Sequence, residues 1–279
     1  MSFLISELAN TFSKKSFEDV LQGDFTYLKK LDAYFFKNQS NTVGEFYDNS
    51  FKLLVKKYKN EYVFKNTIAR KIVIGKHKLA NVSLFSEFKV WNKYLDLLVV
   101  NGTTTAYEIK TEFDSYARLC DQLSVYIRVF EYVNLVIPKH KYTHDLLDKI
   151  PTTVGVITLS DRNTLSQERE ALSNKDNLSA EMIFSCMRKN EYLGVIEKKF
   201  GKLPNVKALY MRSACMEAFN NLNTEELIEG FKDVLKQRNS LVKYRNYLNQ
   251  MPQSMHCMFL CEKFNNVEKI IKMANTKLH

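Results

Sequence analysis

Glycine and proline are scarce in this chain, with 8 Gly and 4 Pro among 279 residues. This scarcity excludes collagen-like, elastic and linker-rich proteins, and it favours long helices joined by tight turns. No apolar run approaches the roughly 18 residues that a membrane-spanning helix needs. The N-terminal residues show no basic segment ahead of a long apolar stretch, so they do not resemble a secretory signal. We therefore expect a cytoplasmic protein without membrane contact.

Cysteine is too sparse to provide a disulfide framework. The five cysteines are odd in number and widely spaced, and no Cys-x-x-Cys occurs, which predicts reduced thiols. His256, Cys257 and Cys261 lack the paired spacing of a zinc site. A chain of this length buries about three-quarters of its unfolded surface, so it needs neither a disulfide nor a structural metal to fold.

Positive charge is in excess, with 41 Lys and Arg against 31 Asp and Glu and a formal net charge of +10. Such an excess favours a phosphate-bearing partner, because Lys and Arg neutralise nucleic-acid phosphates. However, the chain is also rich in Asn, Ile, Phe and Tyr, as proteins from AT-rich genomes tend to be. The charge is equally consistent with that compositional bias, so it does not decide the function.

The order of hydrophobic patterns predicts a mixed α/β core between two helical segments. Residues 1–57 have helical periodicity, with a capping box at Ser16–Asp19. Short strand-like runs occupy 84–90, 93–100, 104–111, 132–137 and 154–159. Helical patterns occupy 43–58, 61–73, 115–131, 144–150, 179–200, 224–236 and 260–277. We predict an N-terminal helical extension (1–57), a core with a mixed central sheet flanked by helices (58–161), and an all-helical subdomain (162–279).

Three charged residues interrupt the apolar strands on either side of an Asn101-Gly102 hairpin signal. If the loop holds residues 101–103, Asp96 lies opposite Glu108, and the strand period places Asp96, Glu108 and Lys110 on one face. Two carboxylates about 5 Å apart repel unless a cation lies between them, and oxygen ligands suit magnesium or manganese. Lys110 would then orient or help deprotonate a metal-bound water. The alternative is a structural strand pair in which Lys110 bridges the two acids.

Asp96 followed by Glu108-Ile109-Lys110 on a hairpin, and then by a helix, resembles the PD-(D/E)XK nuclease superfamily. The surrounding residues are similar to one bacterial branch of it, made up of largely uncharacterised nuclease-like proteins. Leu95 stands where the motif name has proline, which is often missing. The similarity is dense over residues 58–137 and is carried by Glu61–Asn66, Ser86–Phe88, Asp96–Gly102, Tyr107–Glu112, Asp114, Arg118, Leu119, Gln122 and Tyr126–Phe130.

This resemblance implies a restriction-endonuclease-like core and metal-dependent hydrolysis of phosphodiesters. Asp96 and Glu108 would be metal ligands, with the Ile109 carbonyl as a third, and Lys110 would position the attacking water. The family usually adds a glutamate from the first helix of the core, which is the place of Glu61.

Two of these acids have alternative roles. Glu61 is four residues before Lys65, so the two could form a surface ion pair instead. Glu87 would share the face of Asp96 if a two-residue turn lies at Asn92-Lys93, either as a further ligand or as an ordinary strand acid.

The helix expected after Lys110 carries a polar stripe of Arg118, Gln122 and Tyr126 beside an apolar packing face. Superfamily nucleases often place Gln or Tyr there to contact metal-bound water or phosphate, so we expect Gln122 to act in catalysis and Arg118 and Tyr126 to bind substrate. The alternative is a plain solvent face. Basic residues that could follow a phosphate backbone are Lys56, Lys57, Lys59, Arg70, Lys71, Lys76, Lys78 and Lys93, and aromatic residues that could stack on bases are Tyr58, Tyr62 and Trp91.

Together these features predict a magnesium- or manganese-dependent nuclease, for which DNA is favoured over RNA as the substrate although the sequence does not decide between the two. Nuclease-like chains of this size often belong to defence systems, so a further hypothesis is an effector whose catalysis waits for a partner or a phage component. The alternative is a nucleic-acid-binding or protein-interaction module that keeps the fold with little turnover. A protein partner on the helical subdomain and a homo-oligomer are further expectations.

Overall fold

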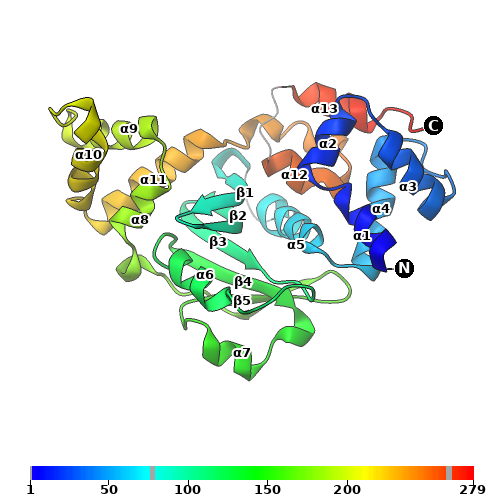
Figure 1. The fold of residues 1–279 in the computed structure, drawn as a ribbon, viewed down its shortest axis with the longest axis horizontal. Helices are drawn as coiled ribbons and strands as arrows, with labels where there is room; N and C mark the ends of the chain where they lie inside the picture. Colours follow the sequence, from blue (N-terminus) through cyan, green and yellow to red (C-terminus); the bar gives the residue numbers. More distant parts are fainter. Residues whose placement is uncertain (1, 76–78, 262–265) are drawn as a thin grey trace.

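A mixed six-stranded sheet forms the centre of the protein, described by a computed structural model of residues 2–75, 79–261 and 266–279 (Figure 1). The strand order follows the sequence, β1-β2-β3-β4-β5-β6. β1, β2 and β3 pair antiparallel, β3, β4 and β5 pair parallel, and β6 is antiparallel to β5. The predicted mixed α/β architecture is confirmed. The strands are β1 (Ser83–Val90), β2 (Lys93–Asn101), β3 (Thr103–Ile109), β4 (Tyr132–Pro138), β5 (Gly155–Leu159) and β6 (Leu165–Arg169).

Helices cover both faces of this sheet. One face packs against α1–α5 with α12 and α13, and the other packs against α6–α11. Successive residues of a strand enter opposite cores, as Ala106 and Tyr107 do on β3, because the strand period is two. The helices are α1 (Ser2–Asn10), α2 (Lys14–Leu21), α3 (Thr26–Phe36), α4 (Val43–Lys57), α5 (Glu61–Ile68), α6 (Leu119–Tyr126), α7 (His144–Lys149), α8 (Ala180–Ser185), α9 (Lys189–Phe200), α10 (Met211–Asn220), α11 (Thr224–Arg238), α12 (His256–Cys261) and α13 (Val267–Ala274). Within the described ranges, no helix is both long and apolar enough to cross a membrane.

The two ends of the chain lie in the same helical layer (Figure 1). Thr42 and Lys277 form an antiparallel bridge, and the Leu278 N–H donates to the Asn41 carbonyl at 3.0 Å. Asn66 fastens α5 to the C-terminal segment, since its Oδ1 accepts from the Cys257 N–H at 2.9 Å and its Nδ2 donates to the Gln253 carbonyl at 3.1 Å. The C-terminal helices α12 and α13 therefore complete the core around α5 rather than join α8–α11.

Strand β6 corrects the prediction that only helices follow residue 162. Leu165–Arg169 contains one apolar residue, and every residue of the strand is at least partly exposed at the sheet edge. An edge strand of this kind shows no alternating apolar signal, so only its pairing with β5 reveals it.

Two predicted helices are shorter than expected because tertiary contacts interrupt them. The predicted helix 115–131 is α-helical only over α6, after which the carbonyls of Arg128 and Glu131 accept from the N–H groups of Ser179 and Asn174. The predicted helix 179–200 is divided into α8 and α9, and Arg238 donates to the Cys186 carbonyl at the break.

Other helix limits differ less. Ser13, rather than Ser16, caps α2. The helix predicted over 61–73 is α5, which continues as a π-helix through Ala69–Ile74. The helix predicted over 260–277 corresponds to the end of α12 and to α13, and residues 262–265 lie outside the described part of the chain.

Candidate metal centre

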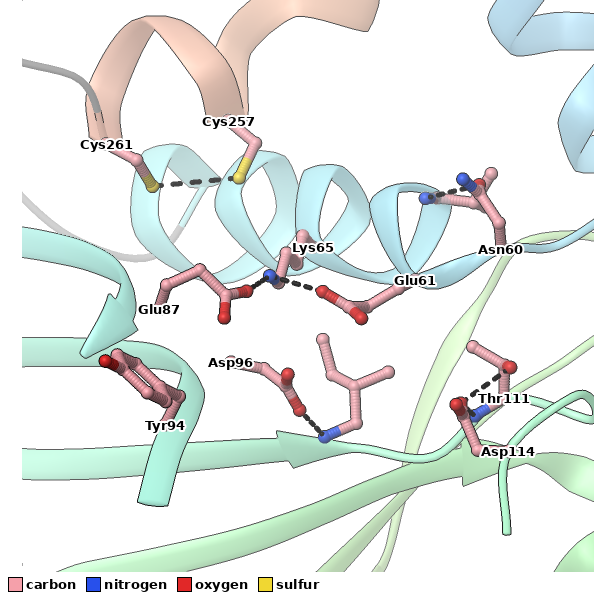
Figure 2. Close-up of polar contacts among 12 residues, drawn as sticks. Asn60, Glu61, Lys65, Glu87, Tyr94, Asp96, Thr111, Asp114, Cys257 and Cys261 are labelled. Atoms are coloured by element: carbon pink, nitrogen blue, oxygen red, sulfur yellow. Dashed lines mark hydrogen bonds and ion pairs between the residues drawn. The ribbon is translucent and has the colours of Figure 1, made fainter. Parts of the chain in front are cut away.

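The candidate site lies where β2 and β3 separate. Their pairing runs from Asn101–Thr103 to Leu97–Tyr107, in the predicted register and around Gly102 with φ of 70°. Beyond this point the Asp96 carboxylate accepts a hydrogen bond from the Ile109 N–H at 2.6 Å (Figure 2). The Asp96 side chain therefore accepts the hydrogen bond that a backbone carbonyl of β2 would otherwise accept. This bond holds the carboxylate between the two strands.

Three carboxylates from three elements converge at this fork. Glu61 comes from the first turn of α5, Glu87 from β1 and Asp96 from β2, and each offers an oxygen within 4.8 Å of the other two. The side chain of Asn60 caps α5 by accepting from the Val63 N–H, so Glu61 starts the helix at the site. The structure thus brings together three of the acids singled out in the sequence.

Glu87 reaches the cluster through irregular backbone. Its φ is 50°, in the left-handed region that disfavours residues with a side chain, and the β1–β2 pairing passes over it. Val90 pairs with Lys93, so the turn is Trp91-Asn92 rather than the predicted Asn92-Lys93. The turn was misplaced by one residue, although Glu87 does lie beside Asp96.

Lys65 supplies the positive charge among these acids. It is 7 % exposed, and its ammonium group forms ion pairs with Glu61 and Glu87 (Figure 2). Burial alone would lower the pKa of Lys65, but Glu61, Asp96 and Glu87 raise it above its ordinary value, so the group stays charged. The Glu61–Lys65 pair is confirmed as a contact, but its lysine is buried. Nothing in the sequence indicated that Lys65 also binds Glu87.

Glu108 and Lys110 form a second, deeper ion pair. Glu108 is 1 % exposed, and its Oε1 accepts from Lys110 Nζ at 2.7 Å. Its other oxygen, Oε2, is buried and has no hydrogen-bond partner among the described residues. Burial raises the pKa of Glu108, and Lys110 opposes this shift. Ile109 packs in the opposite core, beside α5, as the alternation predicted.

Negative charge is in excess across the two groups. Burial and then the carboxylates of Glu108 and Glu61 raise the pKa of Asp96 well above its ordinary value, against the effect of Lys65. Among the described residues, Glu61, Glu87 and Glu108 form ion pairs with two ammonium groups, those of Lys65 and Lys110, and Asp96 is a fourth acid beside them. A divalent cation would relieve this repulsion, and carboxylate oxygens are the donors that magnesium and manganese prefer. The Oε2 atom of Glu108, which lacks a hydrogen-bond partner within the described part of the chain, is available as a ligand atom for such an ion.

Residues of α6 lie behind the acids. Tyr126 is fully buried and donates to the Tyr94 carbonyl at 2.9 Å, so the prediction that it contacts substrate is corrected. Burial and the Glu108 and Asp96 carboxylates raise the pKa of Tyr126, which stays protonated beside Glu108. Gln122 is half-buried near that hydroxyl, and Arg118 is exposed at the start of α6.

Several predicted phosphate or base contacts are already engaged within the protein. Lys93 is ion-paired with Asp121. Tyr62 is buried, and its hydroxyl donates to the Ser254 carbonyl at 2.7 Å. The other engaged residues are Lys59 with Asp161, Arg70 with Gln253, Lys71 with Asn163 and Tyr58 stacked on Phe113. Lys56, Lys57 and Trp91 are exposed, and Lys76 and Lys78 lie outside the described residues.

Two hollows beside the edge strand β1 give access to the acids. The first, of about 700 Å³, lies between α1, α2, α5 and α12 and is lined by Glu61 and Lys65. The second, of about 630 Å³, lies between β1 and the α8–α9 connection. Ser86 and Glu87 line both hollows, so the two openings meet at Glu87, one of the three acids of the cluster.

Comparison with known proteins shows that the part of the chain that carries this site is similar to a phage protein family. The family model described as Bacteriophage P4 protein cII matches residues 55–256, which include all four acids. "Protein cII" of Enterobacteria phage P4 is 32% identical over 127 residues, a match that covers 44% of this chain and 44% of that protein. The matched stretch is therefore less than half the length of this relative. No solved structure matches the chain.

Proposed function

The chain belongs to the Bacteriophage P4 protein cII family, and we propose that it is a divalent-metal-dependent nuclease, acting on DNA rather than RNA. The observation that carries the proposal is the convergence of Glu61, Glu87 and Asp96 beside the buried pair of Glu108 and Lys110. The family description names no activity. The proposal therefore rests on the acids and on the resemblance of Asp96, Glu108 and Lys110 to the PD-(D/E)XK motif.

The donor set fits magnesium or manganese, which Asp96 and Glu108 would hold together with Glu61 or Glu87. The Ile109 carbonyl as a further ligand stays a prediction. Such an ion, when bound, lowers the pKa of an attacking water and stabilises the charge that develops on the phosphate.

Other residues of the chain would hold the acids in position and neutralise charge around this metal. Lys110 is held against Glu108, so its ammonium group stays at the inner end of the acids. Tyr126, fixed by the Tyr94 carbonyl, supports Glu108 from behind, and Gln122 lies next to this hydroxyl. Arg118 is exposed nearby and is available for a phosphate.

One observation favours the second candidate, a nucleic-acid-binding or protein-interaction module with little turnover. Lys65 already neutralises Glu61 and Glu87, so these acids have a structural role without any metal. A protein partner on residues 162–279, a homo-oligomer and a role in phage defence remain predictions under either candidate.

Incubation with labelled single- and double-stranded DNA and RNA, in magnesium, manganese or a chelator, tests the proposal. We expect cleavage only with metal, and we expect Asp96→Asn to abolish it. Lys110→Arg should be nearly as inactive, because a planar guanidinium cannot replace a compact ammonium group at one point. Asp145→Asn is the matched control, since Asp145 is an exposed acid paired with Lys149 on α7. Binding without cleavage under every ion would support the binding module instead.

A further inference from the structure

Trp91 lies in the turn between β1 and β2, in a backbone conformation that is unfavourable for a bulky residue. Its φ is 55°, in the left-handed region where a bulky side chain is strained, and its side chain is 48 % exposed. Tight hairpin turns usually place Asn, Asp or Gly at such positions. The backbone conformation therefore does not explain a tryptophan at this position, and residues that break a local rule in this way tend to serve a function.

The surroundings of Trp91 fit a flat, negatively charged ligand. Trp91 lines the second hollow together with the exposed cations Lys89 and Arg188, and the buried core residues Phe85 and Phe88 form its floor. Arg238 closes one wall, with its guanidinium 5.5 Å from the centre of the Phe88 ring and an ion pair to Glu191. Aromatic surfaces interleaved with cations are typical of sites that stack bases and neutralise phosphates.

The hollow reaches Glu87, one of the three acids of the cluster. Trp91 is four residues from Glu87, or about 13 Å along a strand. Because Glu87 also lines the first hollow, a chain lying on Trp91 and following β1 would pass the cluster of Glu61, Glu87 and Asp96. Tyr94, which is 58 % exposed, lies beside Asp96 (Figure 2).

We infer that the second hollow binds a single strand of nucleic acid, with an unpaired base stacked on Trp91 and the adjoining phosphates near Lys89 and Arg188. A duplex offers mainly base edges in its grooves, whereas a single strand can present the face of a base. The path of the strand in this inference rests on the proposed function, because the strand would run from Trp91 toward the acids that are proposed to cut it.

Trp91 is the one tryptophan of the chain, so tryptophan fluorescence reports on this hollow alone. Metal-free protein in a chelator would be titrated with an oligothymidylate, an abasic strand of the same length, the corresponding duplex and an extended acidic peptide. We expect the oligothymidylate to quench the fluorescence strongly, and the other three probes to quench it little at the same concentration. Equal quenching by the abasic strand would overturn base stacking, and quenching by the peptide alone would assign the hollow to a protein ligand.

Variants separate binding from folding. Trp91→Gly should weaken oligothymidylate binding, measured by anisotropy of a labelled strand, by about 5- to 150-fold, the effect of one lost stacking contact. Its melting temperature should stay level or rise, because glycine accepts the positive φ. Tyr210→Ala, which removes an exposed ring at the start of α10, is the control and should bind normally. Unchanged affinity in Trp91→Gly would overturn the inference.

The two proposals fail in distinguishable ways. Magnesium-dependent cleavage by a wild-type protein whose tryptophan is not quenched would overturn the single-strand site and leave the nuclease proposal standing. Quenching by the oligothymidylate without cleavage in any ion would overturn the nuclease and leave the single-strand site standing.

Discussion

Asp96 serves the sheet and the acid cluster at the same time. As an acceptor for the Ile109 N–H it takes the place of a backbone carbonyl, and beside Glu61 and Glu87 it adds a negative charge at a half-buried position. An amide at this position would keep the first role and lose the second. Asp96→Asn therefore separates the two contributions.

We expect Asp96→Asn to stabilise the metal-free protein at neutral pH. The pKa of Asp96 is higher in the folded state than its ordinary value of 3.8, so the folded state binds more protons between these two values. The free energy of unfolding of the wild type should thus fall as the pH rises through that window. The advantage of the variant should disappear when the pH falls to about 4, because Asp96 then carries a proton in the folded wild type. Urea denaturation in a chelator from pH 4 to 8 measures this, and an advantage independent of pH would contradict it.

Lys65 can be tested by removing its charge while keeping its length. Lys65→Met should lower the free energy of unfolding of the metal-free protein by about 1–3 kcal/mol, less than for a fully buried pair because Glu61 and Glu87 are partly exposed. Magnesium should then raise the melting temperature of the variant more than that of the wild type, because the ion meets acids without a counter-charge.

Lys149→Met is the control for Lys65→Met. Lys149 has the same four-residue spacing from its partner Asp145, but both side chains are exposed. Its loss should change the free energy of unfolding by no more than about 0.5 kcal/mol. If magnesium raises the melting temperatures of Lys65→Met and the wild type equally, then Lys65 and the ion do not compete for the same carboxylates.

At the scale of helices and strands, sequence patterns predicted the features that depend on neighbouring residues, such as the register of a hairpin. The Asn101-Gly102 signal fixed the hairpin register and hence the neighbourhood of Asp96 and Glu108. Edge strand β6 was missed because its side chains are mostly polar. The burial of Lys65 and Tyr126 was missed because residues spaced four apart on a helix do not reveal which side meets the sheet.

The seating of α5 depends on a contact that no local pattern reveals. Asn66 binds the Cys257 N–H and the Gln253 carbonyl, 191 and 187 residues away, and it is fully buried. Asn66→Ala would leave the buried Cys257 N–H without this partner and would remove the hydrogen bond to the carbonyl of Gln253, an exposed residue. We expect this variant to lose about 1–3 kcal/mol of free energy of unfolding, measured by chemical denaturation. Magnesium should also stabilise it less, because α5 carries Glu61.

Asn221→Ala is the matched control for Asn66→Ala. Asn221 also donates to a backbone carbonyl, that of Glu217, but it is exposed at the end of α10. Asn221→Ala should lower the free energy of unfolding by about 0.5 kcal/mol or less. Similar costs for the two variants would mean that Asn66 does not anchor α5.

At the scale of the whole molecule, the net charge of +10 gives a prediction about salt. If the chain binds a single strand, the logarithm of its affinity should fall linearly with the logarithm of salt concentration, by about 0.7 per phosphate neutralised. Lys89→Ala should make the slope shallower by about 0.7 if Lys89 contacts one phosphate. Oligothymidylate titrations in a chelator at several salt concentrations measure both slopes. An affinity that ignores salt would contradict a phosphate-based interface.

The pairing of α5 with the C-terminal segment has a consequence for the newly made chain. Synthesis proceeds from the N-terminus, so β1–β5 and the acids they carry leave the ribosome well before residues 253–257. Until those residues arrive, Asn66 has no partners from them, and the helix that brings Glu61 to Asp96 is not fixed in place. If the chain is the nuclease proposed above, its acid cluster would be complete only once residues 253–257 have emerged, so the protein would be inactive until that stage of its synthesis.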